Sequence, residues 1–170
     1  MPRIQYENSL RARGFEVIGK GLYANVFAKP NSDKVVKVAA WDNWPTYIKW
    51  ATKNGYAGKF APKVENLKFY DDFYVATMER LVGTINDFLD GYSVHHGLYR
   101  EITLWHHDET SEATELLEFV AKLRAENLTG DWHPGNVMVR KDGQIVVTDP
   151  SSARFKGRRF RIKRGQITAP

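Results

Sequence analysis

Three oxygen-bearing side chains flank a predicted β-hairpin late in the chain. Asp131 and Asn136 lie five positions apart before the hairpin, and Asp149 follows its second strand. Because a hairpin returns the chain to its starting point, the three side chains are expected to converge. Carboxylate and amide oxygens suit a hard cation such as Mg²⁺, which makes Asn136 and Asp149 candidate metal ligands. Asp131 is then a candidate general base for an attacking hydroxyl group. Taken singly, each residue also fits a turn-forming role.

A second group of candidate residues lies near the N-terminus. Gly19 and Gly21 fall between two predicted strands, where glycine allows backbone amides to approach a phosphate that a Cβ would obstruct. Lys37 lies on the next predicted strand and could neutralise such phosphates. Alone, the glycines would indicate only a hairpin turn and the lysine only a surface position. Their occurrence in the same chain as the Asp131, Asn136 and Asp149 set favours a phosphate-binding function.

The predicted elements explain how these residues could be positioned. Strands are predicted over residues 15–19, 22–28, 34–39, 66–70 and 73–79, with a hairpin over 137–140 and 144–148. Helices are predicted from an Asp42 or Asn43 cap to Asn54, over 86–107 with a break near Gly97, and from Thr110 or Ser111 onward. The five tryptophans are expected to be mainly core residues. Strands followed by helices and a hairpin indicate an α+β fold.

Composition limits the class of protein. The chain has 170 residues, 42% of them hydrophobic and 26% charged, which is typical of one folded globular domain. No apolar run is long enough to span a membrane, and the N-terminus lacks the pattern of a secretion signal. The absence of cysteine excludes disulfides and thiolate metal sites. A cytoplasmic location without membrane contact is expected, and the sequence does not indicate the oligomeric state.

The positive charge is concentrated near the C-terminus. Seven of the 25 Lys and Arg residues lie between positions 154 and 164, and the chain has 20 acidic residues in all. The rest of the chain is therefore slightly acidic. Such a segment would attract nucleic-acid phosphates or an acidic protein surface, with strong salt dependence. The alternative is a solvated terminus that aids solubility.

The motifs together resemble the protein-kinase superfamily. Its catalytic-loop pattern H-R-D-L-x-x-x-N corresponds to residues 129–136, and its D-F-G triplet corresponds to Asp149 and the next two residues. Residues 19–26 follow G-x-G-x-x-G-x-V with Ala24 in place of the third glycine, and Lys37 matches the lysine of the third strand. The resemblance implies ATP and Mg²⁺ as cofactors, with Asp131 and Lys37 catalytic and Asn136 and Asp149 holding the metal. It implies nucleotide contacts from Gly19, Lys20, Gly21, Ala24, Val26, Lys37, Met78 as gatekeeper, Glu79 and Leu81.

The resemblance also implies a fold and a branch of the superfamily. The expected fold is protein-kinase-like, with an antiparallel β N-lobe over about residues 1–80 and a short, reduced helical C-lobe over about 81–152. Residues 153–170 form a basic tail outside this domain. The catalytic loop is similar to that of aminoglycoside and choline phosphotransferases. Over residues 14–155 the chain is more similar to the early serine/threonine protein kinases of podovirus-type bacteriophages, which implies phosphorylation of host proteins.

Three departures from the kinase pattern are evident. There is no glutamate between Trp41 and Phe60, so the usual lysine–glutamate pair cannot form there. Tyr47 or Glu65 could replace it as the partner of Lys37, or nucleotide alone could hold the lysine. Thr129 and the following glycine replace His-Arg, which argues against control by activation-loop phosphorylation. The chain also ends soon after the Asp149 motif, leaving little room for the helices that normally bind a small-molecule acceptor.

These departures leave alternatives to a Ser/Thr protein kinase. One is a catalytically weak pseudokinase that binds and inhibits a host factor through residues 154–164. The other is a small-molecule phosphotransferase acting on an aminoglycoside-like or choline-like alcohol. The first alternative predicts an effect that survives Asp131→Ala, and the second predicts a phosphorylated alcohol without labelled protein.

Overall fold

A five-stranded antiparallel sheet is the largest element of the fold. In the computed structural model, which describes residues 1–84, 111–131, 134–150, 161–163 and 166–168, its strand order is β1-β2-β3-β5-β4. The strands are β1 (Glu16–Lys20), β2 (Ala24–Ala28), β3 (Lys34–Ala40), β4 (Val64–Phe69) and β5 (Phe73–Glu79). The central strand β3 carries three valines, whose branched side chains fit a strand that has neighbours on both edges.

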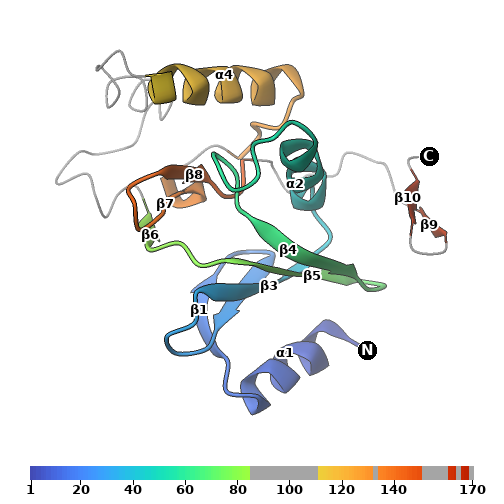
Figure 1. The fold of residues 1–170 in the computed structure, drawn as a ribbon. Helices are drawn as coiled ribbons and strands as arrows, with labels where there is room; N and C mark the ends of the chain where they lie inside the picture. Colours follow the sequence, from blue (N-terminus) through green and yellow to red (C-terminus); the bar gives the residue numbers. More distant parts are fainter. Residues whose placement is uncertain (85–110, 132–133, 151–160, 164–165, 169–170) are drawn as a thin grey trace.

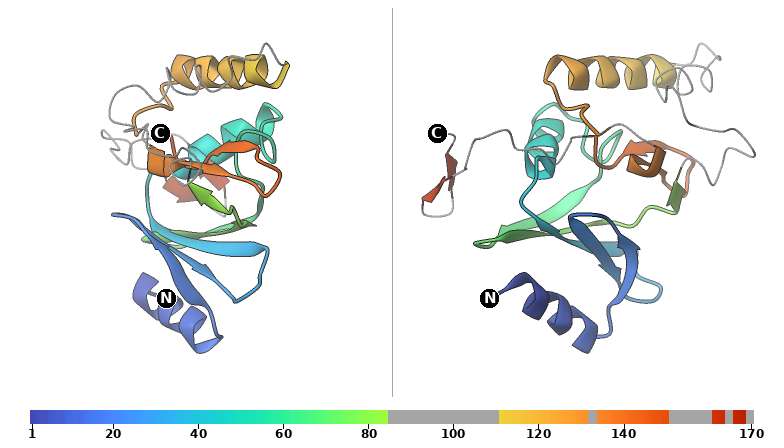
Figure 2. Two further views of the ribbon diagram at one scale, coloured as in Figure 1. Left: turned by 90° about the vertical axis from the view of Figure 1, so that its left-hand side faces the viewer. Right: turned by 180° about the vertical axis from the view of Figure 1, so that it is seen from behind.

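The sheet lies between two layers of helix (Figures 1 and 2). Helix α1 (Arg3–Ala12) covers one face, and α2 (Trp44–Lys53) lies on the other. Side chains of β3 alternate between these faces. Val36 and Val38 pack with Leu10 of α1, whereas Val35 and Ala39 belong to the larger core on the α2 side. The two faces of the sheet therefore belong to separate hydrophobic cores.

A small second sheet lies beside α2, on the same side of the five-stranded sheet (Figure 1). It has the order β6-β7-β8 and consists of β6 (Gly83–Thr84), β7 (Val137–Val139) and β8 (Ile145–Val147), with the short 3₁₀ helix η2 (Pro134–Asn136) directly before β7. The turn between β7 and β8 uses Gly143 at φ 89°, a conformation that favours glycine. In sequence, Asp131 and Asn136 precede this hairpin and Asp149 follows it, so all three lie at its open end, away from the Gly143 turn.

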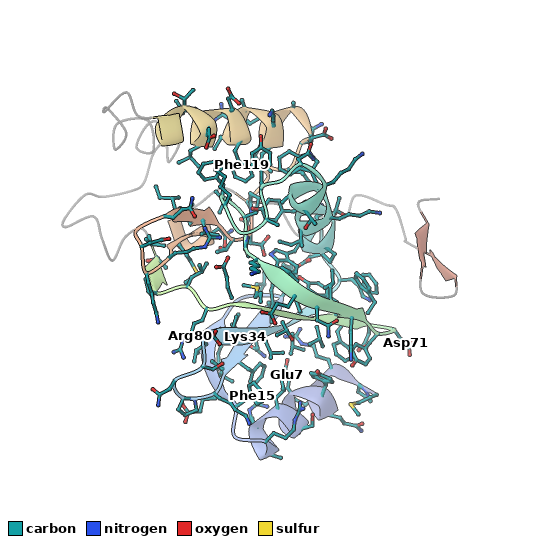
Figure 3. The ribbon with its side chains drawn as sticks, viewed as in Figure 1. Glu7, Phe15, Lys34, Asp71, Arg80 and Phe119 are labelled. Carbon is teal, nitrogen blue, oxygen red and sulfur yellow. The ribbon has the colours of Figure 1, made fainter. Side chains whose placement is uncertain are left out.

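Helix α4 (Ser111–Ala125) closes the α2-side core from above (Figure 3). Its apolar side chains Leu116, Phe119, Val120 and Leu123 are buried, at the spacing of one helical face. Of the face expected from the sequence, Leu116, Val120 and Leu123 are confirmed, whereas Leu117 is half-buried and Phe119 was not expected. Phe119 packs edge-on against Tyr56, with ring centroids 4.9 Å apart. The helix therefore contributes apolar packing to this core.

The sequence predictions of the sheet strands, α2, α4 and the hairpin are confirmed to within about two residues. Helix α1 and the two-residue strand β6 were not predicted. In the C-terminal basic segment, β9 (Arg161–Lys163) pairs with β10 (Gln166–Thr168), where no strand was expected. The helix predicted over 86–107 lies outside the described residues. The division into an N-lobe, a reduced C-lobe and a tail stays a prediction.

Within the described residues, none of the helices combines the length and apolar character required to cross a membrane. The longest of them, α4, spans 15 residues and carries charged residues throughout.

Candidate active site

The glycine, valine and lysine of the N-terminal motifs form one row across the sheet. Gly19 pairs with Val26, Val26 pairs with Lys37, and Lys37 pairs with Ala76. Directly paired residues in antiparallel strands project to the same face. A Cβ added at Gly19 would lie 3.5 Å from Val26 Cβ, which confirms that the two share a face. Gly19 and Lys37, 18 positions apart in sequence, thus lie on the α2 face with Val26 between them.

Lys37 is the central residue of this row and is 6% exposed. Its Nζ donates a hydrogen bond to Asp149 Oδ2 at 2.9 Å and lies 4.3 Å from the ring centroid of Trp44. An ammonium group has three N–H donors. Among the described residues, Asp149 is the only hydrogen-bond acceptor that Lys37 Nζ contacts. The buried cation therefore has spare donors.

Three hydrogen bonds join the residues on either side of Asp149 to the segment that carries Asp131 and Asn136. The amide and hydroxyl of Thr148 both donate to Asn136 O, at 2.7 and 3.0 Å. On the other side of Asp149, the amide of Asp131 donates to Pro150 O at 3.0 Å. The loop is thus fixed to residues on both sides of Asp149. The structure brings the segments that carry the three predicted site residues together.

The side-chain amide of Asn136 has a defined orientation. Its Nδ2 donates to Asp131 O at 2.9 Å and to Asp131 Oδ2 at 3.3 Å. Within the described part of the chain, no hydrogen bond involves Asn136 Oδ1. An oxygen left over by this arrangement is the atom that a cation would use.

The donor set fits magnesium of the kind that is shared with a nucleotide. Among the described residues, no cluster of three or more His, Asp or Glu side chains could hold a metal ion by itself. Mg²⁺ commonly takes only one or two protein ligands and completes its octahedron with water and phosphate oxygens. Asn136 and Asp149 match that requirement.

Helix α2 fixes the strand that precedes Asp149. Trp44 Nε1 donates to Thr148 O at 2.8 Å, and the hydroxyl of Tyr47 donates to Val147 O at 2.6 Å. Burial, and secondarily the charge of Asp149, raises the pKa of Tyr47 well above its usual range, which keeps the hydroxyl a donor. The sequence reasoning did not identify this function of the two aromatic residues.

Two predicted alternatives for the partner of Lys37 are wrong. Tyr47 bonds to Val147 O instead, and Glu65 forms an ion pair with Lys34 at 2.8 Å. Lys34 and Lys37 are three residues apart on β3, so strand alternation directs them to opposite faces. Glu65 therefore pairs with Lys34, whose side chain points away from the candidate site.

Asp42 is a buried acid that the sequence reasoning considered only as a helix cap. Its Oδ1 accepts hydrogen bonds from the Trp44 amide and the Tyr74 hydroxyl, each at 3.0 Å. Burial, and to a smaller extent the charge of Asp149, raises the pKa of Asp42, although Lys37 and the two donors oppose this. The adjacent Asn43 occupies the N-cap position without a side-chain capping bond. Asp42 thus stabilises the start of α2 beside the candidate site.

The glycine-rich turn has no structural requirement for its glycines. Gly21 N donates to Ala24 O at 2.7 Å, closing the turn. Neither Gly19 nor Gly21 has a positive φ, and a Cβ at either position would make only ordinary van der Waals contacts. A turn-forming role therefore does not explain why glycine occupies these positions. Lys20 alternates to the face opposite Lys37 and is not brought to the site.

The predicted adenine-contacting residues lie at the end of β5. Met78 pairs with Val35 and is buried in the α2-side core, on the face that carries Lys37. The Glu79 amide donates to Lys63 O at 3.0 Å, so this N–H is not available to a base. In the described part of the chain, the Leu81 backbone makes no hydrogen bond. Leu81 therefore retains backbone groups that could pair with adenine, whereas Glu79 can offer only its carbonyl.

The Glu79 side chain belongs to a structural clamp. Arg140 Nε and Nη2 donate to the two carboxylate oxygens of Glu79, both at 2.8 Å. Arg140 also donates to Ala61 O at 3.2 Å and to Gln144 Oε1 at 2.6 Å. This clamp joins the end of β5 to the β7–β8 hairpin and so fixes the two halves of the candidate site relative to each other.

Comparison with known proteins identifies a fold but no sequence family. No family model matches the chain, and no curated protein matches it by sequence. Among solved structures, it is similar to the crystal structure of Rad53 1-466 in complex with AMP-PNP, with a TM-score of 0.52 and 17% identity. The match covers 91% of this chain and 44% of the Rad53 chain, so this chain spans less than half of that one. The β-rich half of the molecule, with its antiparallel sheet and few helices, is similar to the N-lobe of a kinase.

Proposed function

We propose that this chain binds ATP with Mg²⁺ and transfers the γ-phosphoryl group to a serine or threonine hydroxyl of a protein. The observation that carries the proposal is the buried Lys37, which lies on the glycine-bearing face of the sheet and has, in the part of the chain that the structure describes, one carboxylate partner for its three donors. A buried ammonium is stable only when it is well paired, so a ligand with several anionic oxygens would complete this site.

Each site residue then has a role set by its position. Lys37 would donate to the α- and β-phosphate oxygens, and the amides of the Gly19–Gly21 turn would approach the same group. Asn136 and Asp149 would hold Mg²⁺, which would neutralise charge that develops on the transferred phosphoryl group. Asp131 would accept a hydrogen bond from the attacking hydroxyl and take its proton as the oxygen bonds to the γ-phosphorus. The bond from that phosphorus to the β,γ-bridging oxygen would break at the same time, and ADP would leave.

Adenine would lie against the strand ends around Met78, with Leu81 supplying backbone hydrogen bonds. The Rad53 structure contains AMP-PNP, an ATP analogue, which supports a nucleotide as the ligand of this fold. Ala24 and Val26 lie on the Lys37 face and would contact the nucleotide from β2.

The acceptor is proposed from the charge and the sequence resemblance. Residues 154–164 carry seven cations, which favours an acidic or nucleic-acid-associated protein. Resemblance to phage early kinases suggests a host protein, phosphorylated in the host cytoplasm. Labelling of proteins in a lysate, and not the geometry of the site, would identify the acceptor proteins.

Transfer of labelled phosphate tests the proposal. The wild-type chain with γ-labelled ATP and Mg²⁺ should label itself or proteins in a bacterial lysate, and Asp131→Ala should lower the rate at least ~100-fold. Asp72→Ala is the matched control, since Asp72 is exposed in the β4–β5 turn. Unchanged labelling by Asp131→Ala would overturn the role of that residue. Label in a sugar or amino alcohol without labelled protein would instead identify a small-molecule phosphotransferase.

A second candidate function is nucleotide-dependent binding without catalysis. The observation that favours it is that α2 has no glutamate and that Lys37 pairs with Asp149, one of the two proposed metal ligands. A binding protein would show MgATP affinity without turnover, and its effect on a partner would survive Asp131→Ala. Turnover by the wild type that depends on Asp131 excludes this candidate.

A further inference from the structure

Lys37 has an aromatic neighbour where the kinase pattern expects a glutamate. Helix α2 contains no acidic residue, and its first residue, Trp44, places its ring centroid 4.3 Å from Lys37 Nζ. A cation over the face of an indole is attracted by the ring quadrupole, and the attraction is larger when both groups are removed from water. Lys37 and Trp44 are both buried, so the contact is of the stronger kind.

The Trp44 ring is held in place independently of Lys37. Its Nε1 donates to Thr148 O at 2.8 Å, and its ring stacks on Tyr74 with centroids 5.7 Å apart and planes 4° from parallel. The backbone amide of Trp44 donates to Asp42 Oδ1, which also accepts the hydroxyl of Tyr74. Contacts at the indole edge, the ring face and the backbone therefore fix the orientation of the ring before any ligand binds.

Metal binding would weaken the hold of Asp149 on Lys37. Asp149 Oδ2 is 2.9 Å from Nζ, and the proposed function requires the same carboxylate to coordinate Mg²⁺. A carboxylate has two oxygens, so Asp149 can contact the ammonium and a cation together, but its negative charge is then shared between them. A buried ammonium that is less well paired is costly, so a second contact is needed to keep it in position until phosphate oxygens reach it.

We propose that Trp44 is the positioning residue of Lys37, holding its ammonium over the indole ring where it can reach both Asp149 and the phosphates of a bound nucleotide. Trp44 also bonds to the residue directly before Asp149, so one side chain positions Lys37 and the strand end that carries its partner. The inference rests on the proposed function, because phosphates reach Lys37 only if MgATP binds.

A double-mutant cycle without nucleotide tests the contact itself. Trp44→Leu is introduced into the wild type and into Lys37→Met, and the unfolding equilibrium constant is measured in urea. If the ring holds the ammonium, Trp44→Leu should change that constant roughly tenfold less in the Lys37→Met background. Equal changes in the two backgrounds overturn the proposal. Should Trp44→Leu fail to fold, Trp44→Phe retains a weaker ring and should show a difference of roughly threefold.

Trp41 provides a matched control within the chain. Like Trp44, it stacks on a neighbouring aromatic ring, here Phe69 at 5.3 Å, and its Nε1 donates to a backbone oxygen, here Asp71 O at 3.2 Å. No cation–π contact involves Trp41 in the described residues. Trp41→Leu should therefore have the same effect with and without Lys37, and a coupling as large as that of Trp44 would contradict the specificity of the contact.

Nucleotide titration separates this role from general packing. Trp44→Phe should weaken MgATP affinity roughly fivefold when measured on folded protein, whereas Trp41→Phe should leave it unchanged. Equal affinities for Trp44→Phe and wild type would show that Trp44 acts only in packing and would overturn the proposal. A wild type that binds no MgATP would overturn the proposed function as well. The two failures are thus distinguished by whether the wild type binds.

Discussion

The two faces of the five-stranded sheet each bury a charged side chain, but only one of them is fully paired. On the α1 face, Glu7 is 4% exposed, and its carboxylate accepts bonds from Arg3 Nε at 2.8 Å and from Asn25 Nδ2 at 3.0 and 3.1 Å. Arg11 lies 3.9 Å from the same carboxylate. Figure 3 shows Glu7 between α1 and the sheet. On the α2 face, Lys37 has the single acceptor Asp149 among the described residues.

The difference indicates which charge is structural and which binds a ligand. A buried carboxylate surrounded by donors is already satisfied, and its role ends with joining α1 to β2. Among the described residues, the Lys37 ammonium has donors without an acceptor and the Asn136 amide oxygen accepts no hydrogen bond. Together with the half-buried Asp149 carboxylate, these groups have the capacity to bind an anion and a cation together. The same sheet thus carries a structural charge on one face and a candidate catalytic charge on the other.

Removing the charge on the α2 face should have the largest effect, and on binding rather than on folding. Lys37→Met should weaken MgATP affinity about 100-fold or more, since the phosphates lose a direct cation. The free energy of unfolding should change by less than about 2 kcal/mol, because the Asp149 side chain that loses its partner is 27% exposed and can be hydrated. Calorimetric titration and urea unfolding measure the two quantities. Lys34→Met, at the exposed pair with Glu65, is the control and should leave affinity unchanged.

Removing the charge on the α1 face should do the reverse. Glu7→Gln should lower the free energy of unfolding by about 2 kcal/mol, because Arg3 and Asn25 lose a charged acceptor. MgATP affinity of the folded protein should stay within about twofold of the wild type, apart from a small effect through Arg3, which also donates to Tyr23 O in the glycine-rich turn. A large loss of affinity with unchanged stability would mean that the two faces are not separate in function.

Glu79, in the clamp at the end of β5, is a second carboxylate that accepts several hydrogen bonds from the protein. Burial favours a higher pKa for Glu79, but hydrogen bonds from Arg140 and the Lys63 amide outweigh it and hold the pKa below the ordinary 4.5. A lowered pKa in the folded state means that the stabilisation is present above about pH 4.5 and is lost as the pH falls through the folded-state value. Glu79→Gln should cost about 1.5 kcal/mol at pH 7 and progressively less below pH 4.5. Equal losses at pH 7 and pH 3, by urea unfolding, would contradict this assignment.

Substitution of Gly19 in the glycine-rich turn should have the smallest effect of these changes, and it separates ligand binding from stability most clearly. Gly19→Ala should leave stability unchanged or raise it by about 0.5 kcal/mol, since the backbone is compatible with alanine and the unfolded chain loses freedom. MgATP affinity should fall roughly fivefold, because the added methyl group obstructs the approach of phosphate. Gly143→Ala is the contrasting control: it should destabilise the hairpin, where φ is 89°, without altering affinity through phosphate contact. Equal affinity of Gly19→Ala and wild type would remove the phosphate argument for this glycine.

Much of the fold could be predicted from local sequence patterns. The five sheet strands, α2 and α4 follow from alternation, helical apolar spacing and capping residues. Helix α1 was missed because it buries only Glu7 and Leu10 fully, so it has no apolar period to detect. Strand β6 consists of two residues and forms only by pairing with β7, far along the chain. Neither feature has a local signal.

The candidate site was predicted less completely than the fold. Asp131, Asn136 and Asp149 could be grouped because a hairpin joins them, and Lys37 because its strand follows a glycine-rich turn. The contacts of Trp44 and Tyr47 with the residues before Asp149 span about a hundred positions, and an aromatic residue on a helix is usually a core residue. The ion pair of Lys37 with Asp149 also joins distant segments, so the sequence could show the missing glutamate but not what replaced it.

The central claim is that one MgATP complex lies between the Lys37 row and the Asn136–Asp149 segment. Titration of the ¹⁵N-labelled protein with a non-hydrolysable ATP analogue and Mn²⁺ tests this directly, because Mn²⁺ broadens the NMR signals of nearby nuclei. The account predicts selective broadening of the Asn136 side-chain amide and of the Asp149 backbone amide, abolished in Asp149→Asn, with the signals of α1 unaffected. Sharp Asn136 and Asp149 signals at saturating analogue, or equal broadening on both faces of the sheet, would contradict it.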